Sequence, residues 1–142
     1  MTNQRKRRAR RAGFTLMEVL LVLAILVILG SMVGIFIQSA QKGAYEDLAR
    51  TQISSFESQL QMFRLNVGSY PSTNQGLEAL RQPPADLKNP AKWRGPYAAK
   101  EIPMDPWGNP YQYELVGPEQ IHIWSWGNDS TDGTEDDISN TQ

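Results

Sequence analysis

The sequence has no cysteine and only one histidine, His122. The absence of cysteine excludes disulfides and thiolate metal sites. No nucleophile motif and no glycine-rich phosphate loop is present, and a lone histidine on an expected strand is more typical of a packed or surface residue than of a catalytic base. We therefore do not expect an enzyme. With 142 residues, the chain has room for one modest domain and an anchor.

Basic and acidic residues are separated along the chain, although the net charge is only -1. Six of the 14 basic residues lie in the first eleven positions, namely Arg5, Lys6, Arg7, Arg8, Arg10 and Arg11. Five of the 15 acidic residues lie near the other end, namely Asp129, Asp132, Glu135, Asp136 and Asp137. Without its basic head the chain is acidic, which disfavours a nucleic-acid partner.

A long uncharged stretch follows the basic head, from Val19 to Gln41, and residues 19–37 are almost wholly apolar. As a helix, those residues would span roughly 28 Å, close to the ~30 Å hydrocarbon core of a bilayer. The positive-inside bias predicts a cytoplasmic amino terminus, with the rest of the chain across the membrane. The competing interpretation is an ordinary secretory signal peptide. Its apolar core would be shorter, and the nearest small-x-small cleavage candidate, Gln38-Ser39-Ala40, is a poor match.

The apolar pattern continues beyond this stretch with helical spacing. Apolar residues recur every three or four positions at Tyr45, Ala49, Ile53, Phe56, Leu60, Phe63 and Val67. The pattern predicts one helix from about Thr15 to Asn66, apolar all round in its first half and amphipathic in its second, which ends before Gly68. The alternative is a transmembrane helix, a break near Gly43 and a separate soluble domain. However, a glycine costs only about 1 kcal/mol inside a helix.

Shorter elements are expected after the long helix. The Ser72-to-Gln75 spacing is typical of a capping box and predicts a short helix over 76–81. Alternating residues at 111–115 and 121–124 predict two antiparallel strands joined by a turn at Gly117-Pro118. Two or three antiparallel strands packed on the amphipathic half of the helix would form a small α+β body.

One carboxylate, Glu18, lies at the start of the apolar segment. Such a charge costs a few kcal/mol in a membrane unless it is neutralised. If the chain were cut between Gly13 and Phe14, the new amine would lie one helical turn before Glu18. The carboxylate could pair with this amine of its own chain or with that of a neighbouring copy, and pairing with a neighbour would also fix the stagger between subunits.

The motif Gly13-Phe14-Thr15-Leu16-x-Glu18, between a basic head and an apolar run, resembles the class III signal of type IV pilins and pseudopilins. The resemblance implies that a prepilin peptidase cuts after Gly13 and methylates the new Phe14 amine, and that Glu18 acts in assembly. The stretches "YPSTNQGLEAL", "DPWGNPYQY" and "SWGNDSTDGTEDDI" are similar to those of the major pseudopilins of type II secretion systems, the G subunits.

This resemblance implies a pilin-like α+β fold, with a long amino-terminal helix packed against a small antiparallel sheet. Residues 1–13 would be a cleaved leader, 14–37 the transmembrane and assembly half of the helix, and 38–142 a periplasmic domain. Within that domain we expect the amphipathic helix half at 38–66, an irregular region at 67–104, the sheet at 105–125 and an acidic calcium loop at 126–139.

The five clustered carboxylates have two interpretations. Composition alone favours a solvated acidic segment, and the spacing does not match an EF-hand. The resemblance instead implies a structural calcium ion. Its expected ligands are the side chains of Asp129, Asp136 and Asp137 and the backbone carbonyls of Trp126 and Thr131, with Ser139 as a weaker candidate. Asp132 and Glu135 depart from the glycine-rich spacer expected of the family.

The implied function is that of a structural subunit that polymerises into the periplasmic pseudopilus of a type II secretion system and drives export of folded proteins across the outer membrane. The implied partners are further copies of the chain, minor pseudopilins, prepilin peptidase, an inner-membrane assembly platform with its secretion ATPase, and membrane lipid before assembly. The implied location is the inner membrane, with a single span. The alternative is a type IV pilus subunit for adhesion, motility or DNA uptake. Many of those subunits close their last loop with a disulfide, which a chain without cysteine cannot form.

Overall fold

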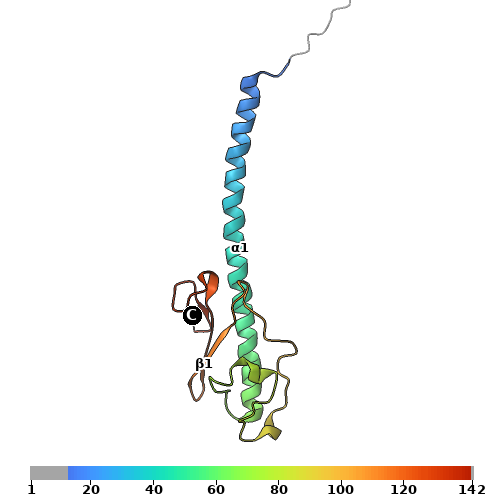
Figure 1. Cartoon of the computed structure of the whole chain (residues 1–142), viewed down its shortest axis with the longest axis vertical. Helices are drawn as coiled ribbons and strands as arrows, with labels where there is room; N and C mark the ends of the chain where they lie inside the picture. Colours follow the sequence, from blue (N-terminus) through green and yellow to red (C-terminus); the bar gives the residue numbers. More distant parts are fainter. Residues whose placement is uncertain (1–12, 142) are drawn as a thin grey trace, which may run out of the picture. The chain divides into compact units, whose positions relative to one another are not determined.

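The computed structural model describes residues 13–141, without the side chains of Ile35, Phe36, Gln38 and Ser39 (Figure 1). The expected leader therefore lies outside the described residues, except for Gly13. The chain divides into two compact units, one ending at Ala40 and the other running from Gln41 to Gln142.

The long helix α1 runs from Leu16 to Val67 without interruption (Figure 1). It begins with a side-chain cap, because the Thr15 hydroxyl accepts the Glu18 N–H at 3.2 Å. It ends at Val67, and the N–H of the following residue, Gly68, donates to the Arg64 carbonyl at 2.7 Å. The predicted single helix is confirmed within one residue at each end, and the alternative break at Gly43 is wrong.

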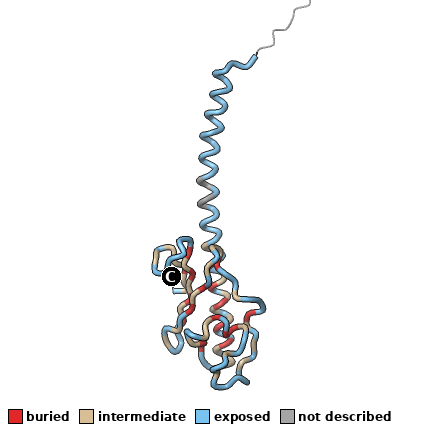
Figure 2. The backbone as a smooth tube through the Cα atoms, in the orientation of Figure 1, coloured by how far each residue is buried: buried red, intermediate tan, exposed pale blue. Residues whose placement is uncertain are grey.

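The first unit presents an apolar helical surface. Residues Leu16–Gly34 form a segment long and apolar enough to cross a membrane. All of its residues are exposed (Figure 2). An uninterrupted apolar surface of this size is not stable in water, so lipid or other protein must cover it.

The second unit contains a three-stranded antiparallel sheet in the order β1-β2-β3. Strand β1 spans Gln112–Gly117, β2 spans Gln120–Ser125 and β3 spans Ile138–Ser139. The predicted hairpin is confirmed, with Tyr113 opposite Ile123. The position of the third strand was not predicted, since it falls inside the segment assigned to the acidic loop. The α+β class is confirmed.

The core of the second unit is formed by buried residues of α1, of the sheet and of the segment between them that contains Leu77–Leu80 (Figure 2). The middle of the predicted apolar stripe is buried, at Ala49, Ile53, Phe56, Leu60 and Phe63. The rings of Phe56 and Tyr111 meet edge to face at 5.2 Å between centroids. The ends of the stripe are less covered, because Tyr45 is 42% exposed and Val67 is only partly buried.

Three short 3-10 helices complete the unit: η1 at Leu77–Leu80, η2 at Pro90–Lys92 and η3 at Gly127–Asp129. The predicted capping box is present, since the Ser72 N–H donates to Gln75 Oε1 at 2.9 Å and the Gln75 N–H donates to Ser72 Oγ at 3.3 Å. The helix that follows is shorter than the expected 76–81. Gly76, at φ 58°, interrupts the helical backbone, so η1 starts only at Leu77.

Candidate functional sites

The expected cleavage site lies just before α1. Gly13 and Phe14 have no helical hydrogen bonding, and Phe14 is 82% exposed. An added Cβ on Gly13 would meet nothing within 4 Å. The backbone around the Gly13–Phe14 bond is therefore open to an enzyme, while the first helical turn begins two residues later.

Glu18 occupies the first turn of α1, three residues after the capping residue Thr15. A carboxylate there interacts favourably with the partial positive charge of the helix amino terminus. Thr15 was not singled out from the sequence, although the Thr-x-x-Glu spacing is a recognisable capping signal. Glu18 thus has a local role in starting the helix, and its exposed carboxylate still needs a counter-charge in an apolar environment.

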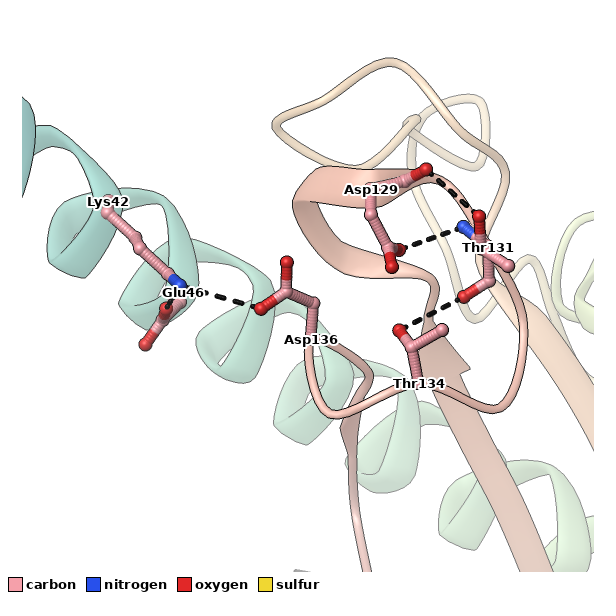
Figure 3. Close-up of polar contacts among 6 residues, drawn as sticks. All are labelled: Lys42, Glu46, Asp129, Thr131, Thr134 and Asp136. Atoms are coloured by element: carbon pink, nitrogen blue, oxygen red, sulfur yellow. Dashed lines mark hydrogen bonds and ion pairs between the residues drawn. The ribbon is translucent and has the colours of Figure 1, made fainter.

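The acidic loop, residues 126–139, contains several internal hydrogen bonds (Figure 3). Asp129 Oδ1 accepts the Thr131 N–H at 3.0 Å, and the Thr131 hydroxyl donates to the Asp129 carbonyl at 3.1 Å. The Thr134 hydroxyl donates to the Thr131 carbonyl at 3.4 Å. Two of the expected calcium-binding residues, Asp129 and Thr131, therefore lie together.

The other two expected carboxylates have different partners. Asp137 Oδ2 accepts the Gly133 N–H at 2.7 Å, whereas Asp137 Oδ1 is buried with no hydrogen-bond partner among the described residues. Asp136 Oδ1 lies 3.4 Å from the ammonium group of Lys42 on α1 (Figure 3). Ser139, the weaker candidate, lies on β3, with its hydroxyl 3.2 Å from that of Thr141.

The loop has two features that fit a calcium ion. The orphaned Asp137 Oδ1 is a buried acceptor, and buried acceptors normally have a partner. Gly127 has φ 67°, and an added Cβ would clash with the Asp136 carbonyl oxygen, so the two backbone segments approach each other closely there. The expected donors are all oxygens, as calcium prefers. Within residues 13–141, however, no three His, Cys, Asp or Glu side chains are gathered closely enough to hold a metal.

Asp132, which departs from the expected spacer, has a contact of its own. Its Oδ1 accepts the indole N–H of Trp124 at 2.8 Å and so ties the loop to β2. His122 stacks on the same indole, with ring centroids 4.5 Å apart. Nothing in the spacing signals the Trp124–Asp132 bond, since it depends on how the loop folds back over the sheet.

Two polar side chains that sequence reasoning missed hold the body together near the loop. The buried carboxylate of Asp105 accepts the Trp107 N–H at 3.1 Å and the Asn109 N–H at 2.7 Å. Asn140 donates to Glu57 Oε1 on α1 at 2.9 Å and accepts the Ile123 N–H at 2.9 Å. These bonds link the turn before β1, the sheet and α1.

Two tyrosines in the core are held in their protonated form. Burial, helped by the charge of Asp105, raises the pKa of Tyr111 to about 12. Burial also raises the pKa of Tyr113, whose hydroxyl donates to the Pro71 carbonyl at 2.7 Å. At neutral pH Tyr111 packs against Phe56, and Tyr113 also forms the hydrogen bond to Pro71.

Two family models match successive parts of the chain. Residues 8–34 match the prokaryotic N-terminal methylation motif. Residues 36–141 match type II secretion system protein G.

Curated relatives and a solved structure extend the likeness over nearly the whole chain. The chain is 41% identical over 134 residues to the type II secretion system core protein G of Aeromonas hydrophila, and the match covers 92% of each protein. It is 38% identical over 137 residues to the core protein G of Pseudomonas aeruginosa, and the match covers 94% of this chain and 96% of that protein. The crystal structure of the major pseudopilin from the type 2 secretion system of enterohaemorrhagic Escherichia coli superposes with a TM-score of 0.64 at 36% identity, over 72% of this chain and 87% of the other. The apolar helix, the small sheet and these matches together establish that the chain belongs to the type II secretion system protein G family.

Proposed function

We propose that this chain is the major structural subunit of the periplasmic pseudopilus of a type II secretion system. The observation that carries this function is the exposed apolar segment Leu16–Gly34, on the same helix that forms the core of the body. A surface of that kind is covered by lipid in a membrane, or by the same surface of other copies in a filament. The family is structural, and the protein is not an enzyme.

Before assembly, the subunit is anchored in the inner membrane by a single span, with the basic head in the cytoplasm and residues 38–142 in the periplasm. The positive-inside bias supports this orientation. Prepilin peptidase cleaves after Gly13 and methylates the amine of Phe14. The exposed, non-helical position of both residues and the match to the methylation motif support this processing.

During assembly, the apolar halves of many copies replace lipid around one another. Glu18 of one copy pairs with the Phe14 amine of its neighbour, which neutralises both charges and fixes the stagger of the helices. The exposed first turn of α1 leaves Glu18 accessible for this pairing. A buried pair of this kind is costly to break because each partner would be left uncompensated.

Growth of the filament then moves the secreted proteins. A secretion ATPase acting through the inner-membrane assembly platform drives subunits out of the bilayer, and minor pseudopilins complete the filament. The growing pseudopilus pushes folded cargo toward the outer-membrane channel. The pilus alternative is disfavoured, since the matching relatives are secretion system proteins and the chain has no cysteine.

A structural calcium ion is part of this proposal. Asp129, Asp136 and Asp137 would supply carboxylate oxygens, and Trp126 and Thr131 backbone carbonyls. The orphaned oxygen of Asp137 and the tight backbone approach at Gly127 support the site. Bound calcium would neutralise the repulsion among the acidic side chains and stabilise the body.

Deletion of the gene in its native host tests the function. We expect the deletion strain to retain folded substrate proteins in its periplasm, and the intact gene to restore them to the culture medium. Surface piliation and twitching, measured in the same strains, should be unchanged. Loss of pili with normal protein export would contradict the proposed function.

A further inference from the structure

Lys42 is a residue of α1 whose side chain reaches the acidic loop. Its ammonium group is 3.4 Å from Asp136 Oδ1 and 4.0 Å from Glu46 Oε1 (Figure 3). Glu46 is one helical turn further along α1, whereas Asp136 is 94 residues away in sequence. Within the described part of the chain, this is the one ion pair that joins the acidic loop to α1.

The partner of Lys42 is also an expected calcium ligand. Five carboxylates lie between Asp129 and Asp137, so a positive charge beside Asp136 relieves part of their mutual repulsion. A calcium ion on the same carboxylate would require a dication close to an ammonium group. Lys42 and calcium therefore repel each other at Asp136, and each weakens the binding of the other to this carboxylate.

We propose that Lys42 is a built-in counter-ion of the acidic loop, which shares Asp136 with calcium and competes with it. Lys42 keeps the loop attached to α1 without calcium and lowers the affinity of the loop for calcium. This inference rests on the calcium site in the proposed function. As a consequence, the stability of the folded body depends less on calcium than it would if the five carboxylates had no cationic partner.

The size of the effect is set by the exposure of the pair. The side chain of Lys42 is 57% exposed and that of Asp136 is 33% exposed. Ion pairs of this kind are partly screened by water and salt, so removal of Lys42 should change calcium affinity about two- to fivefold. By linkage, calcium and Lys42 must weaken each other by the same factor.

The test compares the full-length chain in detergent with Lys42→Gln, which removes the charge, and Lys42→Arg, which keeps it. Calorimetric titration with calcium chloride should give a dissociation constant about two- to fivefold lower for Lys42→Gln than for the unmodified chain. Lys42→Arg should bind as the unmodified chain does. In chelator, Lys42→Gln should melt at a lower temperature than the unmodified chain. Lys92→Gln removes an exposed lysine on η2 and serves as the matched control for net charge.

Three results would overturn the inference, and the third would reject the calcium site with it. If Lys42→Gln binds calcium with unchanged or weaker affinity, Lys42 does not compete with calcium. If Lys42→Gln in an Asp136→Asn background still lowers the melting temperature in chelator, the effect of Lys42 does not pass through Asp136. A full-length chain that binds no calcium would reject the calcium site together with this inference. Normal calcium binding without an effect of Lys42→Gln would reject this inference alone.

Discussion

The hydroxyl of Ser125 donates to the carboxylate of Asp105, and both side chains are buried, at 0% and 5% exposure. The same carboxylate accepts two backbone N–H groups of the turn before β1. It therefore holds that turn against the end of β2. A buried carboxylate with three donors is stable only as a complete network.

We expect Asp105→Ala to destabilise the body by about 3 kcal/mol, because it leaves the buried Ser125 hydroxyl and the part-buried N–H groups of Trp107 and Asn109 without their acceptor. Asp105→Asn, which keeps an acceptor oxygen, should cost less. Urea unfolding of the detergent-solubilised chain, followed by circular dichroism, measures both. Asp86→Ala, which removes an exposed carboxylate bonded to Gln75, is the control. A loss as large for Asp86→Ala as for Asp105→Ala would show that burial is not the cause.

Gly127 and Gly133 form a matched pair of glycines at the acidic loop. Both have positive φ, 67° and 82°, but an added Cβ clashes with the Asp136 carbonyl only at Gly127. Backbone strain alone should make Gly133→Ala cost about 1 kcal/mol. Gly127→Ala should cost clearly more, because Asp136 must also move. Thermal unfolding of the two variants side by side tests the difference, and equal losses would mean that the close approach is easily relieved.

Alkaline pH should destabilise the body through its buried tyrosines. An unfolded tyrosine ionises near pH 10, whereas the pKa of Tyr111 is raised to about 12 and that of Tyr113 is also raised. Their contribution to stability is therefore complete below pH 10 and is lost as the pH rises toward 12. Tyr111→Phe should reduce this alkaline loss, as measured by urea unfolding at pH 8 and at pH 11.

Tyr113→Phe provides an internal comparison. It also removes the hydrogen bond to the Pro71 carbonyl, so it should cost about 1 kcal/mol already at pH 8. If both variants still lose as much stability at pH 11 as the unmodified chain, ionisation of these two tyrosines is not the cause of the alkaline loss.

Calcium should stabilise the body. At a free calcium concentration about a hundredfold above its dissociation constant, binding contributes roughly 2.7 kcal/mol. For a body of this size, that corresponds to a rise in melting temperature of roughly 10 °C over the value in chelator. Asp137→Ala should abolish the rise. Glu135→Ala removes an exposed acid that is not a proposed ligand and should retain it. Identical melting of the unmodified chain in calcium and in chelator would reject the site.

Glu18→Ala should leave membrane insertion and cleavage intact, yet reduce the yield of filaments at least tenfold, since breaking a buried charge pair costs several kcal/mol. Mass spectrometry of the membrane protein monitors cleavage, and quantification of sheared filaments monitors assembly. Thr15→Ala removes only the helix cap, worth about 1 kcal/mol, and should assemble nearly as well as the unmodified chain. Normal filaments from Glu18→Ala would contradict the proposed pairing.

Local patterns were sufficient to predict the elements whose residues are close in sequence. The 3.6-residue period extends along one continuous stretch, so α1 could be placed within one residue at each end. The alternation in β1 and β2, joined by Gly117-Pro118, likewise predicted their hairpin. Strand β3 consists of two residues whose only indication is their pairing with Trp124 and Ser125, and no local pattern could reveal it.

The candidate sites show the same division. The motif around Glu18 is contiguous and could be recognised directly. The environment of Asp136 could not, because Lys42 lies in the helix 94 residues earlier and meets the loop only in the folded body. The role of Asp132 was equally hidden, since its partner Trp124 belongs to a strand and the bond crosses the surface of the sheet.

The bond between Trp124 and Asp132 gives the acidic loop an intrinsic fluorescent reporter. Indole emission responds to the polarity and hydrogen bonding around the ring, and this indole N–H is held by a residue of the loop itself. Any rearrangement of the loop that breaks the bond changes the surroundings of a natural fluorophore on β2. The arrival of a cation, or the docking of another subunit at this end of the body, can therefore be followed optically without attaching a dye.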